Sequence, residues 1–413
     1  MNAALETLRE RGLFAQCSGA DALSQLMDEH PVEFYVGIDP TGTSLHIGHL
    51  VPLYALAHLA KAGHRPVVLV GGGTARIGDP SGKTEVRKML TVEEIDANVA
   101  AISAQIDRFL AAAGTSATIV NNSDWLAGLN YIDFLRDIGR HFSVNRMLSF
   151  ETYRMRLETG LSFIEFNYQL LQSFDFLELF RDRGVRLQIG GDDQWGNIVA
   201  GVDLIRRVAG AEAFGLTFPL VTRADGKKMG KTEAGSVYLD ARLVSPYEMH
   251  QYWRNVPDAD VERFLLTFTF LPADECRQLG ALRGERINEA KDRLANEATA
   301  LIHGREAADA ARSAARSAFG VGPGAARGGL DAIPDLSIPA SELDAGIGVL
   351  DLFSRTDLCS SRSEARRLVA QGGARINDRP VTDVDAVIDS SWAEDGQLLL
   401  RAGKKRYFRV LAT

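Results

Sequence analysis

The stretch Glu33-Phe-Tyr-Val-Gly-Ile-Asp39-Pro-Thr-Gly-Thr-Ser-Leu-His46-Ile-Gly48-His49 joins two structural signals. It begins as an alternating, strand-like run, and the residues that follow it, 50–62, have the apolar periodicity of a helix. His46, Gly48 and His49 therefore stand where a strand leads into a helix. Such a junction offers backbone N–H groups and the positive end of a helix dipole, and both favour phosphate. The pattern predicts a nucleotide site; for this segment alone, a helix start that merely contains two histidines is the alternative.

Strand-like and helical segments alternate through the first half of the chain. We expect strands at 34–38, 67–70, 117–120 and 185–189, and helices at 50–62, 93–113, 131–142, 163–180 and 197–208. This alternation predicts an α/β domain over 1–220, a Rossmann-like parallel sheet with helices on both faces. Ligands of such folds bind at the carboxyl ends of the strands. Those ends carry Asp39, then 71–74, 121–122 and 190–193.

The composition excludes several classes of protein. The chain has 413 residues, of which 46% are hydrophobic and 24% charged, as in a soluble globular protein of two to three domains. The net charge of −8 means that any contact with nucleic acid must come from local patches. Three distant cysteines speak against a disulfide framework or a zinc site and agree with a reducing, cytoplasmic location. We find no apolar run of membrane-spanning length and no signal-peptide pattern.

The second half of the chain has a different organisation. We expect a lysine loop and a helical domain over 221–319, because the pattern becomes helical from about residue 245. Residues 320–346 hold six glycines and three prolines, which predicts a linker. A final small α+β module is expected over 347–413.

Two further clusters suggest phosphate chemistry. In Lys227-Lys228-Met-Gly230-Lys231-Thr232, two lysines flank a glycine, and such a loop can close over a polyphosphate. Taken alone, this segment is more simply interpreted as a solvated basic turn, but the upstream histidines favour the nucleotide role. The second cluster, Gly71-Gly-Gly-Thr-Ala-Arg-Ile-Gly78-Asp79-Pro-Ser-Gly-Lys83, is followed by Arg87. Lys83 and Arg87 could reach pyrophosphate. The spacing from Gly78 to Lys83 is one residue short of a P-loop, so we exclude that class.

The histidine and lysine clusters resemble the HIGH and KMSKS motifs of class I aminoacyl-tRNA synthetases. Three segments narrow the resemblance to the tyrosyl-tRNA synthetase family: Tyr35-Val-Gly-Ile-Asp39-Pro-Thr, Phe163-Ile-Glu-Phe-Asn-Tyr168-Gln-Leu-Leu-Gln172-Ser-Phe-Asp175 and Leu187-Gln188-Ile-Gly190-Gly-Asp-Asp193-Gln194-Trp-Gly-Asn197. The helical spacing of Tyr168, Gln172 and Asp175 places them on one face. In the lysine motif Gly230 stands for the usual central Ser.

The resemblance implies a tyrosine–tRNA ligase that makes tyrosyl-adenylate and pyrophosphate from L-tyrosine and ATP. It then transfers the tyrosyl group to the 3′ end of tRNA(Tyr). The phenol of tyrosine is expected at Asp175 and Tyr35. The resemblance gives tyrosine binding to Tyr35, Asp79, Tyr168, Gln172, Asp175, Gln188 and Gln194. It gives ATP binding to Asp39, Thr41, His46, Gly48, His49, Gly191, Asp193 and Lys231. It gives catalysis to His46, His49, Lys83, Arg87, Lys228, Lys231 and Thr232. Mg²⁺ is expected with ATP as substrate, without a protein metal site or a tightly bound cofactor.

The final module resembles an S4 RNA-binding domain. Arg362, Arg366 and Arg367 would form a basic stripe on one helix, and Lys404 and Lys405 would form a second cluster. A solvated helix face is the alternative. The resemblance also implies a homodimer, with an interface near 125–148.

Three other functions compete with this interpretation. A tryptophanyl-tRNA synthetase shares the fold, but Asp175 with Tyr35 and the tail argue against it. A non-catalytic RNA-binding protein on a synthetase scaffold is disfavoured because the histidines and lysines are all present. Other HxGH adenylyl transferases are usually far shorter and lack the tail.

Overall fold

The structure is a computed structural model that describes residues 1–81, 90–222, 224, 229–232, 235–318, 333–394, 396–403 and 406–413. It divides into two compact units. The first comprises Met1–Val244 with Trp253–Ile302, and the second Ser245–Tyr252 with His303–Thr413.

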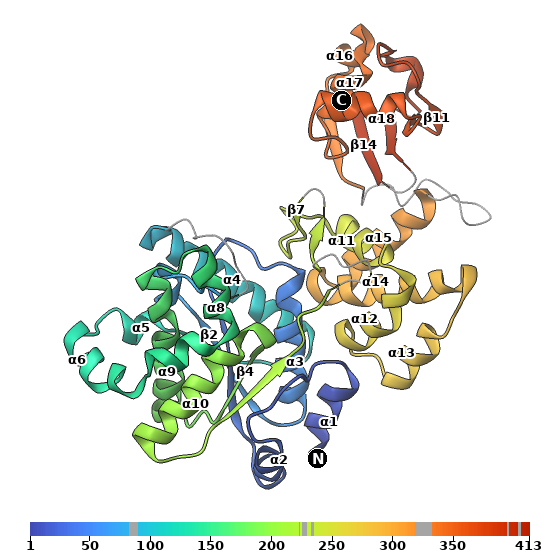
Figure 1. The fold of residues 1–413 in the computed structure, drawn as a ribbon. Coiled ribbons are helices and arrows are strands. Elements are labelled where there is room, and N and C mark those ends of the chain that lie inside the picture. Colours follow the sequence, from blue (N-terminus) through green and yellow to red (C-terminus); the bar gives the residue numbers. More distant parts are fainter. Residues whose placement is uncertain are drawn as a thin grey trace. The chain divides into compact units, whose positions relative to one another are not determined.

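A five-stranded parallel sheet forms the centre of the first unit (Figure 1). Its order is β3 (Thr118–Asn121), β2 (Arg65–Val70), β1 (Glu33–Ile38), β4 (Leu187–Gly191) and β5 (Phe214–Phe218). Strands β1, β2 and β3 follow one another toward one edge of the sheet, and β4 is then added on the opposite side of β1. The order therefore reverses between β1 and β4, and doubly wound sheets bind ligands at such a point. The expected Rossmann-like sheet is confirmed, and β5 is a strand that we did not predict.

Both faces of this sheet are covered. Tyr35, Val67 and Leu69 point to one face and share a buried cluster with Phe174 and Phe176 of α9 (Phe163–Arg183). The alternating side chains, such as Phe34 and Val36, point to the opposite face and are also buried, at 0% and 2% exposure. The other helices near the sheet are α1 (Ala3–Glu10), α2 (Ala20–Glu29), α3 (Leu50–Lys61), α4 (Val92–Ala112), α5 (Ser123–Leu126) and α10 (Trp195–Ala209).

One predicted helix is shorter than expected. In place of a helix over 131–142, α6 (Tyr131–Asp137) is followed by a 3₁₀ turn at Gly139–His141. Asn130 caps the start of α6 by accepting from the N–H groups of Ile132 and Asp133. Gly139 weakens the continuation, because glycine is a poor helix former. The chain then forms α7 (Val144–Ser149) and α8 (Glu151–Thr159).

Short strands and a set of helices complete the first unit. They are β6 (Lys231–Thr232), β7 (Gly235–Ser236), α12 (Val261–Phe268), α13 (Ala273–Gly280) and most of α14 (Ile287–His303). Arg11 ties the N-terminal segment to this part, donating to the carbonyl oxygens of Leu266, Thr269 and Leu271 at 2.7–3.0 Å. A guanidinium there satisfies carbonyls at the C-terminal end of α12 and favours the negative end of its dipole.

The second unit contains a separate five-stranded sheet in the order β11 (Arg379–Pro380), β10 (Ala374–Ile376), β13 (Gln397–Ala402), β14 (Arg406–Ala412) and β8 (Asp335–Ile338). Its remaining elements are α11 (Pro246–Arg254, largely in this unit), α15 (Arg305–Ala318), α16 (Ala340–Ala345), β9 (Ile347–Gly348), α17 (Val349–Ser354), α18 (Arg362–Ala370) and β12 (Val387–Ile388). Phe353, Ala365 and Leu400 are among the fully buried residues of its core.

The predicted linker over 320–346 differs from the structure in its last part. β8 pairs in parallel with β14, so 335–338 belong to the sheet of the final module. Ile338 is only 3% exposed and Leu336 packs on the same core. The flanking Pro334 and Pro339 gave this segment the composition of a linker, although Leu336 and Ile338 alternate as in a strand.

Candidate active site

His46 and His49 cap the helix start that precedes α3. The Nδ1 of His46 accepts the Gly48 N–H at 3.0 Å, and the Nδ1 of His49 accepts the His46 N–H at 3.1 Å. Since each Nδ1 is an acceptor, the neutral ring carries its proton on Nε2, which can donate to a ligand oxygen. A Cβ at position 48 would lie 2.8 Å from the His46 ring, so this motif needs a glycine between its histidines.

Gly230, the glycine of the lysine motif, lies against this histidine motif. Gly230 has a φ of +76°, and a Cβ there would lie 3.4 Å from the backbone nitrogen of Gly48. Val237 donates to the Gly230 carbonyl at 2.8 Å, and Ile47 donates to the Val237 carbonyl at 3.0 Å. Two motifs that are far apart in sequence are thus brought together. Lys228 lies outside the described residues; Lys231 and Thr232 are described through their backbone, which forms β6.

Helix α4 holds the loop that leads to the histidines. The amide of Asn98 donates to the Pro40 carbonyl at 3.1 Å, and the Oε1 of Gln105 accepts the Leu45 N–H at 3.0 Å. Both side chains are buried. We did not predict this role. The sequence does contain a sign of this role. Asn98 and Gln105 are seven residues apart and share one helix face with the apolar Ile95 and Ile102.

Asp175 lies at one end of a row of hydrogen-bonded polar side chains that also includes Asn122, Thr74 and Asp39. Its Oδ2 accepts from the Asn122 amide at 2.9 Å and its Oδ1 from the Trp125 indole at 2.8 Å. Burial raises the pKa of Asp175 to about 7; these two hydrogen bonds act to lower it, and the carboxylates of Asp39 and Glu178 act to raise it. The sequence predicted Asp175 but not its two donors.

The opposite end is formed by Tyr168 and Asp39. The Tyr168 hydroxyl donates to Oδ2 of Asp39 at 2.8 Å, and the Thr74 hydroxyl donates to Oδ1 of Asp39 at 2.8 Å. Burial, followed by the charges of Asp39 and Asp79, keeps the pKa of Tyr168 well above its ordinary value. Tyr168 is therefore a neutral phenol whose proton is committed to Asp39.

A third group of side chains surrounds Asp79. The Gln194 amide donates to Oδ2 of Asp79 at 2.8 Å. Asn197 donates to Gln194 Oε1 and to Gln172 Oε1, both at 3.1 Å. The structure thus brings together Asp79, Gln172 and Gln194, which the sequence had predicted, and adds Asn197 and Ser81, whose N–H donates to Asp79 at 2.9 Å.

Among the described residues, two buried polar atoms on neighbouring strands of the sheet have no hydrogen-bond partner. They are the hydroxyl of Tyr35 and the Oε1 of Gln188. The two residues are register partners on β1 and β4, so their side chains share one face of the sheet. They are 1% and 2% exposed. Because buried polar groups are almost always paired, two neighbouring ones without a partner indicate a place for a polar ligand.

The remaining predicted ATP residues lie at the carboxyl ends of β1 and β4. Thr41 is exposed in the loop after β1, and Gly191 ends β4 before Asp193. The neighbouring Asp192 does not extend this group, since its Oδ1 accepts from Thr217 at 2.8 Å and from Gln16 at 2.5 Å. Lys83 and Arg87 lie outside the described residues.

Comparison with known proteins gives a consistent result. The family model for class I tRNA synthetases (W and Y) matches residues 27–320, and that for the tyrosine–tRNA ligase SYY-like C-terminal domain matches 329–410. The chain is 58% identical over 412 residues to the tyrosine–tRNA ligase of Treponema denticola, with 100% of both chains covered. It is 51% identical over 407 residues to that of Caldanaerobacter subterraneus subsp. tengcongensis, with 98% of each covered.

The chain belongs to the tyrosine–tRNA ligase family of class I tRNA synthetases. Among solved structures, a C-terminally truncated mitochondrial tyrosyl-tRNA synthetase of Aspergillus nidulans is 31% identical, with a TM-score of 0.70. That match covers 77% of this chain and 95% of the other. A Plasmodium falciparum tryptophanyl-tRNA synthetase, at 15% identity and a TM-score of 0.53, shares the fold alone. The family expected from the sequence is confirmed.

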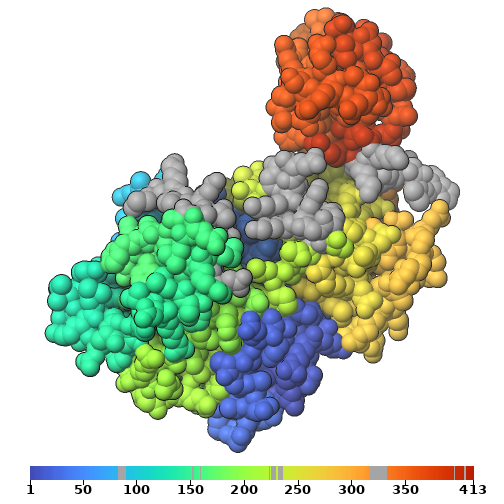
Figure 2. All heavy atoms as spheres, in the orientation of Figure 1, coloured from blue at the N-terminus to red at the C-terminus, as the bar shows by residue number. Residues whose placement is uncertain are grey.

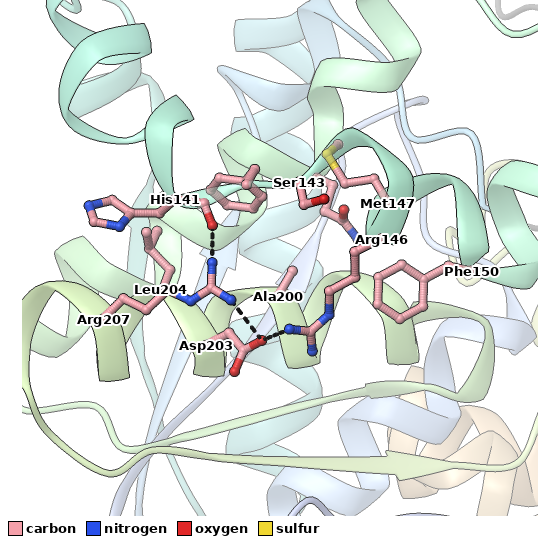
Figure 3. Close-up of a pocket in the computed structure, with 11 residues that line it drawn as sticks. His141, Ser143, Arg146, Met147, Phe150, Ala200, Asp203, Leu204 and Arg207 are labelled. Carbon is pink, nitrogen blue, oxygen red and sulfur yellow. Dashed lines mark hydrogen bonds and ion pairs between the residues drawn. The ribbon is translucent and has the colours of Figure 1, made fainter.

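The first unit of this tyrosine–tRNA ligase family member has a small hollow away from the residues described above. It is lined by residues of α7, α9 and α10 and has a volume of about 40 Å³, room for a few waters. Asp203 forms ion pairs there with Arg146 and Arg207, and Arg207 also donates to the carbonyl of His141 (Figure 3). These contacts hold α7 and the 139–141 turn on α10.

The second unit of this ligase family member carries the predicted arginine stripe. Arg362, Arg366 and Arg367 lie on α18 and are exposed. Arg362 and Arg366 line an open hollow of about 320 Å³, and Arg362 forms an ion pair with Asp351. Lys404 and Lys405 lie outside the described residues.

Proposed function

We propose that this chain activates L-tyrosine with ATP and transfers the tyrosyl group to the 3′ end of tRNA(Tyr), using the residues described above. The observation that carries the assignment is the pair of partnerless buried atoms on Tyr35 and Gln188 beside Asp175. They lie at the switch point of the sheet, where this fold class binds ligands. An amino acid with a polar ring substituent would satisfy them.

Tyrosine is assigned an extended position across the pocket. Its phenol donates to Asp175 and pairs with the Tyr35 hydroxyl. Its α-ammonium lies toward Tyr168, Gln172 and Asp79, with Gln188 and Gln194 completing the site. Phenylalanine would leave the buried Asp175 and Tyr35 without that partner, and an unmade buried hydrogen bond carries the full desolvation cost. This explains how the site rejects an amino acid that lacks only the hydroxyl.

The activation step needs no general base, since the carboxylate of tyrosine is already a nucleophile at neutral pH. It attacks the α-phosphorus of ATP and pyrophosphate leaves, so the protein's contribution is positioning and charge stabilisation. His46 and His49 would donate from Nε2 to phosphate oxygens. Lys83, Arg87, Lys228, Lys231 and Thr232 are assigned to the departing pyrophosphate, and Asp39, Thr41, Gly48, Gly191 and Asp193 to the nucleotide.

Magnesium is assigned to the ATP phosphates as part of the substrate. Among the described residues no group of three or more His, Cys, Asp or Glu side chains has the arrangement of a metal site.

The RNA is assigned to the exposed arginines of α18, Arg362, Arg366 and Arg367, together with Lys404 and Lys405. Contacts between arginines and phosphates would make tRNA binding depend on salt. A cytoplasmic location is proposed with this function. In the described part of the chain, no helix has both the length and the hydropathy needed to cross a membrane.

A homodimer is proposed from an exposed apolar surface. Tyr131, Ile132, Val144, Met155, Leu157, Phe163 and Ile164 are 46–69% exposed. They lie between α6 and the start of α9, a segment that forms one side of the first unit (teal to green in Figure 2). Several exposed large apolar side chains on neighbouring elements favour a protein contact. This region extends the interface expected near 125–148.

The proposal is tested by charging purified tRNA with radiolabelled amino acids, one at a time. We expect acid-precipitable label with tyrosine and ATP and none with tryptophan or phenylalanine. Charging with tryptophan in place of tyrosine would contradict the assignment of Asp175 and Tyr35 to a phenol.

A further inference from the structure

Asn122 occupies the centre of a hydrogen-bond chain that joins the two ends of the pocket. It is fully buried, at 0% exposure. Its amide nitrogen donates to Oδ2 of Asp175 at 2.9 Å and to the Thr74 hydroxyl at 3.0 Å. Its amide oxygen accepts the Gly73 N–H at 2.7 Å. All three of these bonds go to groups that lie at the carboxyl ends of strands or on α9.

The chain continues from Thr74 to the far end of the site. Thr74 is 2% exposed, and its hydroxyl donates to Asp39 at 2.8 Å, with the Gly71 carbonyl as a more distant second acceptor at 3.2 Å. The hydroxyl oxygen accepts from Asn122. Asp39 also accepts from Tyr168. The directions of donation are therefore fixed along the path, from Asn122 to Thr74 to Asp39. A hydroxyl that accepts a hydrogen bond becomes a stronger donor, so neighbouring bonds in such a chain support one another.

We propose that Asn122 is a positioning residue that couples Asp175, at the phenol end, to Asp39, at the other end, through Thr74. The proposal rests on the proposed function, since it concerns how that tyrosine pocket is held. Asn122 touches neither substrate in the assignment above. Through Asn122, the orientation of the Asp175 carboxylate depends on the hydrogen bonds that the Asp39 carboxylate accepts. Recognition of the phenol hydroxyl then depends on a threonine whose hydrogen bonds, among the described residues, do not include one to Asp175.

The test replaces Thr74 by Val, which keeps the shape and removes the hydroxyl. Activation is followed by ATP–pyrophosphate exchange, with the kcat/KM for tyrosine divided by that for phenylalanine as the readout. We expect this ratio to fall about three- to tenfold, the size of one neutral hydrogen bond, together with a rise in KM for ATP. A Thr74→Val enzyme with an unchanged ratio and a changed KM for ATP alone would overturn the coupling.

Thr217 provides a matched control. It is equally buried, at 0% exposure, its hydroxyl also donates to an aspartate at 2.8 Å, and it also accepts an N–H, from Gln16 at 3.2 Å. Its aspartate is Asp192, which has no bond to the Asn122 chain among those described. Thr217→Val should therefore lower thermal stability without changing the ratio of tyrosine to phenylalanine. An equal fall of the ratio in both variants would show a general structural effect and contradict the proposal.

A second pair of variants tests the centre of the chain. Trp125→Phe removes the other donor to Asp175 and leaves Thr74 bonded, so its effect should add to that of Thr74→Val. Asn122→Leu removes the centre, and in that background Thr74→Val should cause no further fall of the ratio. Additive effects of Asn122→Leu and Thr74→Val would overturn the proposal. If Asn122→Leu does not fold, the comparison of Thr74→Val with Thr217→Val still tests whether Thr74 is coupled to Asp175. Lack of exchange by the unchanged protein with tyrosine would instead contradict the proposed function.

Discussion

Asp175 combines deep burial with an incomplete set of partners. Its two donors, Asn122 and Trp125, satisfy one direction on each oxygen, and a carboxylate can accept from more. Burial raises its pKa to about 7, above the ordinary value of 3.8. Tyr35 and Tyr168 face it from β1 and α9, and the charges of Asp39 and Glu178 act on it. The residue is therefore poised between its neutral and charged forms near neutral pH.

This pKa predicts how tyrosine affinity changes with pH. A raised carboxyl pKa means that the protonated form stabilises the empty protein at low pH, and that this stabilisation is lost as pH rises through about 7. A phenol donor prefers the ionised form, so the dissociation constant for tyrosine should fall about tenfold from pH 6 to pH 8. Calorimetric titration at several pH values measures it.

The control for this prediction is Asp175→Asn, which accepts a hydrogen bond but does not titrate. Its affinity should be weaker and nearly constant over the same pH range. If the unchanged protein and the Asn variant show the same pH dependence, the titration belongs to another group than Asp175.

At the scale of elements, the docking of the lysine loop on the histidine motif depends on a backbone conformation. Gly230 adopts a φ of +76° where it lies against Ile47 and Gly48. Any other residue would strain the backbone there by about 1–2 kcal/mol. The glycine that replaces the usual serine of this motif therefore makes the docked position accessible without strain.

Gly230→Ala should accordingly slow adenylate formation about five- to tenfold, by opposing the docked loop, and leave tyrosine affinity unchanged. Stopped-flow measurement of activation and equilibrium binding separate the two effects. Gly210→Ala is the matched control, because Gly210 has a φ of +64°, ends α10 and has open space around its Cβ position. It should lower stability and keep the activation rate. Equal activation rates in Gly230→Ala and the unchanged protein would contradict a role for the docked loop.

Elements with a strong pattern were predictable from the sequence, and those that depend on distant partners were not. The run 34–38 and the spacing of Tyr168, Gln172 and Asp175 predicted β1 and the site face of α9. The strand β8 (Asp335–Ile338) was not predicted, because its only strand partner in the described part of the chain is β14, more than seventy positions away in the sequence. The sequence placed 71–74 and 121–122 at the ends of strands, but it did not predict the roles of Asn122 and Thr74. Nothing local distinguishes a buried hydrogen-bonding amide or hydroxyl from one in a loop.

At the scale of the whole molecule, the proposed function assigns activation and RNA binding to different units. The histidine motif, the pocket and the docked loop all lie in the first unit, and the arginines of α18 lie in the second. The second unit has its own core, which includes β8, so it extends further toward the N-terminus than its resemblance alone suggested. Ala311, Ala314 and Ala315 of α15 also pack with Ile333 and Tyr407.

A chain that ends at residue 332 should form tyrosyl-adenylate normally and lose charging of tRNA by at least about a hundredfold, because the phosphate contacts are gone. A chain that ends at 346 keeps β8 without its partner β14. It should give the same kinetics but be less soluble, since Leu336 and Ile338 lose their cover. Undiminished charging by the shorter chain would contradict the assignment of tRNA binding to α18.

The central claim is that one pocket recognises tyrosine by its phenol and activates it with ATP. It is tested most directly by ATP–pyrophosphate exchange with the full chain, using tyrosine, phenylalanine and tryptophan separately. We predict rapid exchange with tyrosine, far slower exchange with phenylalanine and none with tryptophan. Absence of exchange with tyrosine, or equal exchange with tyrosine and phenylalanine, would contradict the account.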